Sequence, residues 1–109
     1  MASARVTGAG TTAANGVYTL ASGSGKIAIY ELAGTDYALT YDGGNFQWVL
    51  WEAATTHIYN DDGSYPGSDN PWDSAGPWQV DTGGTLPAPT VTLYIPGGGI
   101  RRRRRRRYL

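Results

Sequence analysis

The sequence predicts an all-β protein, a small antiparallel β-sandwich or barrel that carries a basic C-terminal arm. Three observations lead to this fold class. The 109-residue chain contains 16 Gly, 8 Tyr and 4 Trp, a composition that suits tight turns and pleated strands. Short strand-like segments recur about every ten residues, separated by turn residues. Good helix formers do not cluster, and two threonines cut short the longest candidate helix, residues 50–56.

The first half of the chain predicts four strands. Asn15-Gly16 is a strong turn dipeptide and precedes the first of them. Residues 37–41 alternate large apolar side chains with Ala and Thr, the period-two pattern of a half-buried strand. Residues 42–45 read Asp-Gly-Gly-Asn and predict a hairpin turn into the next strand. The four strands expected here are residues 17–20, 27–32, 37–41 and 46–51.

The second half predicts shorter strands between longer connections. Residues 57–59 form a short strand, and a polar loop follows over residues 60–70. Residues 71–78 are irregular chain with two anchoring tryptophans, and residues 78–80 pair briefly with a neighbour. The prolines of residues 86–89 place that stretch at a sheet edge or outside the sheet. Residues 91–95 alternate again and form the last strand, which brings the total to about seven.

The strand at residues 46–51 has apolar side chains on both faces. Phe46, Trp48 and Leu50 share one face, whereas Val49 and Trp51 share the other. We therefore expect this strand to be central in the sheet, or one of its faces to meet another subunit. Trp51, on the face opposite to Trp48, is the candidate for an exposed partner-binding residue. The core should take its residues from alternating strand positions: Tyr18, Ile29, Leu39, Trp48, Leu50 and Val91.

Charge divides the chain into two parts. The residues from 1 to 100 hold two basic side chains, Arg5 and Lys26, against nine acidic ones, which gives 2 − 9 = −7. Seven consecutive arginines then give +7. We expect a β-rich domain at residues 1–96 and a Gly hinge with a polyarginine arm at 97–109. The predicted partner-binding residues of the arm are Arg101, Arg102, Arg103, Arg104, Arg105, Arg106 and Arg107.

Several classes of protein fit the sequence poorly. The chain has no cysteine, which excludes disulfides and thiolate metal sites. No apolar run approaches the ~20 residues of a membrane helix, so we expect no membrane partner. The first ten residues lack the apolar stretch of a signal peptide, and Met1 leads us to expect a complete small gene product.

Catalysis is not expected. Nucleophilic chemistry needs a base beside the nucleophile, and the single histidine, His57, is better explained as a strand-edge or surface residue. The two glutamates, Glu31 and Glu52, lie at expected strand ends, and nothing in the sequence brings them into one cleft. Residues 60–64 resemble part of a calcium loop, but the glycine is one place off the EF-hand pattern and no glutamate closes the loop. We therefore expect neither a catalytic residue, a metal nor a cofactor.

The order of several landmarks resembles a small module of bacteriophage tail and other virion structural proteins. The resemblance begins with Val-x-Gly-Ala-Gly at residues 6–10 and Asn-Gly-x-Tyr at residues 15–18. It continues through Tyr30, Trp-x-Leu at 48–50 and Ile-Tyr at 58–59, and closes with Pro-Trp and Gly-x-x-Pro-x-Pro-x-Val at residues 84–91. It covers roughly residues 4–93 and does not include the arginine run. The resemblance implies a virion component, synthesised in the host cytoplasm, and no particular chemistry.

Three functions remain open from the sequence. The first is a structural protein, a capsid decoration or tail component, that acts in many copies and is anchored to other virion proteins by its arginine tail. The second is a carbohydrate-binding module for host surface glycans, whose candidate residues are Trp72, Trp78 and Tyr59. The third is a nucleic-acid-associated protein that uses the tail as its arm. We favour an acidic protein surface over nucleic acid as the partner of the tail, because the arm lacks interleaved aromatics and the acidic domain would repel phosphates.

Overall fold

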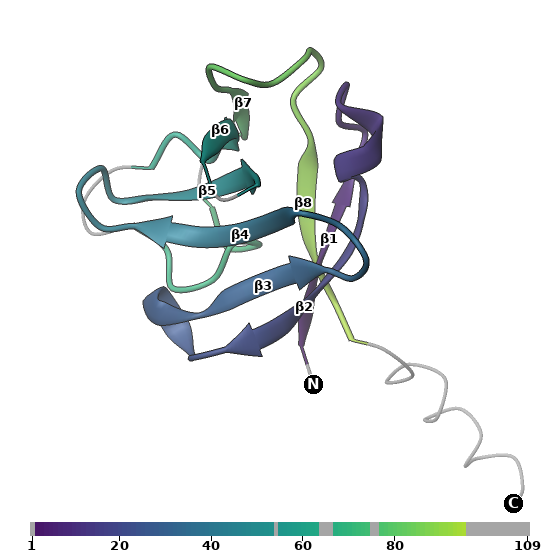
Figure 1. Ribbon diagram of the computed structural model, residues 1–109. Coiled ribbons are helices and arrows are strands. Elements are labelled where there is room, and N and C mark those ends of the chain that lie inside the picture. The colour runs from purple at the N-terminus through teal and green to yellow at the C-terminus, as the bar shows by residue number, and fades with distance from the viewer. Residues whose placement is uncertain (1, 54, 64–66, 75–76, 96–109) are drawn as a thin grey trace, which may run out of the picture.

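A computed structural model describes residues 2–53, 55–63, 67–74 and 77–95 (Figure 1). Eight strands form one antiparallel sheet that curls into a half-barrel. The strands are β1 Ser3–Thr7, β2 Gly16–Ser22, β3 Ile29–Leu32, β4 Tyr37–Asp42, β5 Gln47–Glu52, β6 Thr56–Asn60, β7 Gln79–Val80 and β8 Thr90–Tyr94. The expected all-β antiparallel fold is thus confirmed, as a single curled sheet.

The chain builds the sheet largely as a meander. Consecutive strands pair from β1 to β7, and β8 then returns to the opposite edge beside β1, which gives the order β7-β6-β5-β4-β3-β2-β1-β8. The hairpin between β4 and β5 keeps a regular register from Tyr37↔Glu52 to Asp42↔Gln47. At its turn the side chain of Asp42 accepts hydrogen bonds from Gly44 N at 3.0 Å and Asn45 Nδ2 at 2.8 Å. The predicted hairpin at residues 42–45 is therefore confirmed, together with the interior position of β5.

Near the N-terminus the strands differ from the sequence prediction in two places. The strand expected from residue 27 begins at Ile29, because Gly25–Ile27 form a 3-10 turn. The first strand, β1, had no counterpart in the sequence prediction, since its inward residues Ala4 and Val6 are small and give a weak alternation. Pairing with both β2 and β8 stabilises this strand.

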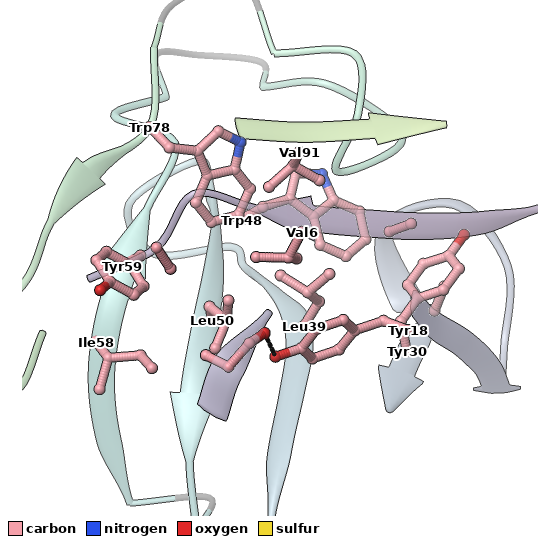
Figure 2. Packing of buried hydrophobic residues seen from close by; sticks show 14 residues of the cluster. Val6, Tyr18, Tyr30, Leu39, Trp48, Leu50, Ile58, Tyr59, Trp78 and Val91 are labelled. Atoms are coloured by element: carbon pink, nitrogen blue, oxygen red, sulfur yellow. Dashed lines mark hydrogen bonds between the residues drawn. The ribbon is translucent and has the colours of Figure 1, made fainter. Parts of the chain in front are cut away.

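The core lies on the concave face of the curled sheet (Figure 2). Five of the six expected core residues are buried there: Tyr18, Leu39, Trp48, Leu50 and Val91. The expectation for Ile29 was wrong, because Ile29 is 37% exposed while the next residue, Tyr30, turns inward and is buried. The register explains this choice, since Tyr30 pairs with Leu39 on the inner face.

Buried hydroxyl groups in the core have partners. Tyr18 Oη donates to the carbonyl oxygen of Ala14 at 2.7 Å. Tyr59 Oη donates to Thr85 O at 2.6 Å and accepts from Thr11 N at 2.9 Å. The long connection after β7 and the turn after β1 are thereby tied to one side chain of β6.

Candidate functional site

A cleft of about 160 Å³ lies beside the beginning of β8. Its walls come from two parts of the chain that are distant in sequence, the segment before β7 and the first residues of β8. The lining is mainly aromatic and proline side chains with two hydroxyl groups: Trp72, Ser74, Pro77, Trp78, Pro89, Thr90 and Val91. The structure thus brings together two of the residues that the sequence marked as candidates for glycan binding.

The two tryptophans of the cleft are held in different ways. Trp72 is half-buried and meets the ring of Tyr30 edge-on, with centroids 5.7 Å apart and planes at 74°. Trp78 is only 7% exposed. Its Nε1 is buried and finds no acceptor among the residues that the structure describes. A buried donor without a partner costs about 1–3 kcal/mol. A ligand that offered a hydrogen-bond acceptor to Trp78 Nε1 would recover that free energy on binding.

A buried carboxylate fixes the chain that carries Ser74. Asp61 accepts a hydrogen bond from Trp48 N at 2.9 Å through one oxygen and from Ser74 Oγ at 2.6 Å through the other. Asp61 N in turn donates to Trp48 O at 3.1 Å. Trp48 also reaches the same loop through Nε1, which donates to Ser68 O at 3.0 Å. The loop that forms one wall of the cleft is therefore anchored on β5.

Tyr59, the third residue predicted for glycan binding, lies in the core, which corrects that prediction. It is fully buried in the core, and its hydroxyl group is occupied by Thr11 and Thr85. A sugar ring cannot stack on a tyrosine that has no exposed face. The alternation of β6 places Tyr59 inward, opposite Leu50 of β5.

Trp51 lies on the outer face of the sheet, away from the core. It is half-buried, its Nε1 donates to Thr40 Oγ1 at 2.7 Å, and its ring meets that of His57 edge-on with centroids 4.1 Å apart. Thr40 is the cross-strand partner of the fully buried Val49. The indole therefore covers part of this outer face, and its role as a partner-binding residue stays a prediction.

His57 belongs to this outer-face cluster and not to the cleft. Its Nδ1 lies 3.7 Å from Asp81 Oδ2. Burial acts to raise the pKa of Asp81, but hydrogen bonds from Asn60 and Thr82, with the nearby His57, outweigh it and hold the pKa below the usual 3.8. The contacts of His57 are thus the ring of Trp51 and the carboxylate of Asp81.

A second hollow is acidic, and no motif in the sequence predicted it. It measures about 390 Å³ and is lined by Glu31, Thr35, Asp36, Tyr37, Ala38 and Ala53. Glu52 pairs directly with Tyr37 across the β4–β5 hairpin. Burial, and then the negative charge of Glu52, raise the pKa of Tyr37. Glu31 and Glu52 are 21 residues apart in sequence, and the pairing of β3, β4 and β5 brings their strands together.

The remaining sequence predictions concern metals, membranes and the tail. Within residues 2–53, 55–63, 67–74 and 77–95, no group of three or more His, Asp or Glu side chains is placed to hold a metal ion. The same ranges contain no helix long and apolar enough to cross a membrane. The arginines at 101–107 lie outside the described residues.

Comparisons with protein-family models, with curated proteins and with solved structures found no match for this chain. The likeness to phage tail and virion modules therefore rests on the sequence landmarks alone.

Proposed function

We propose that the chain is a non-enzymatic structural protein of a virion, a capsid decoration or tail component, that binds acidic surfaces of neighbouring subunits through Arg101–Arg107. The observation that carries the proposal is the separation of charge: seven arginines follow a domain of net charge −7. Guanidinium groups pair with carboxylates through two parallel hydrogen bonds, so an acidic surface is a suitable partner.

The domain itself supplies such a surface. Six of its nine carboxylates belong to exposed residues: Glu31, Asp36, Glu52, Asp62, Asp69 and Asp73. In the described ranges only Asp69 lies beside a lysine or arginine, 3.5 Å from Lys26. Arg5 instead lies over the ring of Tyr94 at 4.7 Å. The carboxylates are thus available to cations from another copy or another subunit.

The test removes the charge of the tail and keeps the rest of the chain. The protein would be expressed with the genes that flank its own, and particles would be purified on a density gradient. The wild-type chain should co-sediment with particles, and a variant with Gln at all seven arginine positions should remain in the soluble fraction. A variant with seven lysines should be partly incorporated, because it keeps the charge and loses the bidentate geometry. Normal incorporation of the Gln variant would contradict the proposal.

Salt dependence distinguishes a protein partner from nucleic acid. On duplex DNA, seven phosphate contacts would give a log–log slope of about −6. The seven-Gln variant keeps the acidic domain and lacks the basic arm, so it can serve as an acidic protein partner for the wild-type chain. If the wild-type chain bound a short duplex with that slope and did not bind the seven-Gln variant, the nucleic-acid function would be favoured instead.

The cleft favours a second candidate function, recognition of a glycan. Trp72 and Trp78 line one cleft, and the described residues offer the Trp78 N–H no acceptor. Aromatic faces and a few polar groups are the usual elements of such a site. Calorimetry with a panel of surface glycans should show binding that Trp72→Ala abolishes and Trp51→Ala, on the other face, leaves intact. Absence of binding across the panel would remove this candidate.

A further inference from the structure

In the part of the chain that the structure describes, the sheet has two edge strands, β7 and β8, and they differ. The edge at β7 is only two residues long, which is one of the ordinary ways in which proteins limit edge-to-edge association. The edge at β8 is five residues long, Thr90–Tyr94, and contains no charged residue and no proline. No backbone hydrogen bond from these five residues to anything but β1 occurs in the described part of the chain. We propose that β8 pairs antiparallel with β8 of a second copy around a two-fold axis.

The apolar side chains on β8 point to the same contact. Val91 faces the core and pairs with Val6, and Leu93 follows on the same face opposite the buried Ala4. Leu93 is nevertheless 47% exposed, and Ile95, two residues further on, is 50% exposed. These two residues continue the core face of the sheet beyond the edge that the chain itself covers, so a strand added at this edge would bury apolar surface.

A two-fold axis through Thr92 would cover these residues. In that register Leu93 lies opposite the partner's Val91, and Ile95 lies beside the partner's Pro89. Pro89 has no N–H and cannot continue the ladder, so it sets a natural end to the pairing. An antiparallel pair is self-complementary, since each copy presents the same five residues to the other. The outer-face residues Thr90, Thr92 and Tyr94 bring no charges together.

The charges of the chain favour a second copy as the occupant of this edge, and this step rests on the proposed function. In an antiparallel pair Ile95, the last described residue, lies at the end of the partner where its β8 begins. Trp72 and Ser74, between which Asp73 lies, border that end. The twelve residues from 96 to 107 span at most about 40 Å, which is enough for the arginines to meet exposed carboxylates of the partner such as Asp73 and Asp69.

The test is the mass of the full chain by sedimentation velocity over a concentration series, at low salt and at about 1 M NaCl, where the Debye length is about 3 Å. The wild-type chain should sediment as a dimer of twice 11.6 kDa at both salt concentrations. Thr92→Lys places two like charges at the axis and should raise the dimer Kd at least about tenfold. Thr19→Lys, on an exposed position of the interior strand β2, is the matched control and should leave the Kd unchanged.

A second variant tests whether the weaker dimer of Thr92→Lys reflects only a local effect of the lysine. Leu93→Ser removes the exposed apolar contact and should weaken the dimer in the same direction, while circular dichroism shows an intact fold for all variants. A monomer at high salt, or a dimer unaffected by Thr92→Lys and Leu93→Ser, would overturn the inference. Association that occurs only at low salt and is lost in the seven-Gln variant would overturn it and leave the proposed function standing. If the dimer resists salt and is weakened by the β8 variants, the inference is supported. If the seven-Gln variant nevertheless enters particles, the proposed function is contradicted while the inference stands.

Discussion

At the scale of single residues, the side chain of Asp61 connects β5 to the loop that carries Ser74. It is buried, and its two carboxylate oxygens join the backbone of β5 to the hydroxyl group of Ser74. A side chain that accepts a strand N–H replaces a backbone partner that the sheet does not supply at that point. The wall of the Trp72–Trp78 cleft therefore depends on one carboxylate.

We expect Asp61→Ala to lower the free energy of unfolding by about 2 kcal/mol, because it leaves the buried Trp48 N–H without an acceptor. Asp69→Ala, at an exposed aspartate of the same loop, is the control and should change stability by less than about 0.5 kcal/mol. Urea denaturation followed by tryptophan fluorescence measures both. Equal stability of the two variants would show that the Asp61 bonds contribute nothing.

The pKa of Asp81 predicts a dependence of stability on pH. Its folded pKa lies below the usual 3.8, so the stabilisation is present above that pH and is lost as the pH falls through the folded value. The melting temperature of the wild-type chain should therefore fall below about pH 4, and Asp81→Asn should reduce that fall. Asp62→Asn, at an exposed aspartate, controls for the loss of one negative charge, and an identical acid profile for both variants would contradict the assignment.

At the scale of elements, β5 is apolar on both faces because the two faces meet different surroundings. Trp48 and Leu50 enter the core, while Val49 is covered on the outer face, where Trp51 bonds to Thr40. A central strand in a half-barrel thus contributes to the core and to a separate outer cluster. The position of Trp51 in that cluster is compatible with a contact made partly by its own chain and partly by a neighbour.

We expect Trp51→Ala to weaken assembly more than it weakens the monomer. The monomer should lose about 1 kcal/mol, in line with one hydrogen bond and partial burial, whereas Trp48→Ala should lose about 3–5 kcal/mol. Chemical denaturation and sedimentation velocity measure the two effects. A monomer destabilised as strongly as by Trp48→Ala, with unchanged assembly, would make Trp51 a purely structural residue.

The connection after β1 also has a close approach that glycine permits. A Cβ on Gly10 would lie against the backbone of Leu86, and Gly10 N donates to Pro87 O at 2.9 Å. Gly10→Ala should therefore separate the two connections and cost about 2 kcal/mol or more. Gly43→Ala, where a Cβ meets no atom within 4 Å, should be nearly neutral. Thermal unfolding of both variants decides the point, and equal melting temperatures would refute it.

At the scale of the whole molecule, the fold is held by one aromatic core and needs no cofactor in our prediction. The core cluster runs from β1 and β8 to β6, and polar side chains bridge the long connections. We expect the melting temperature and the far-ultraviolet circular dichroism spectrum to be the same before and after dialysis against a chelator. A shift to lower temperature that calcium reverses would instead indicate a metal site, for which residues 60–64 are the sequence candidate.

The sequence by itself determined the all-β class, the 42–45 hairpin and most strands, because alternation and turn residues act over short distances. It also determined the division of charge between domain and tail. Only the tertiary structure decided that β8 returns to pair with β1, that Tyr59 is buried, and that Trp72 and Trp78 share a cleft. It also decided that Tyr30 rather than Ile29 turns inward. Each of these depends on which strand lies beside which, and strand order and curvature are set by packing between residues far apart in the chain.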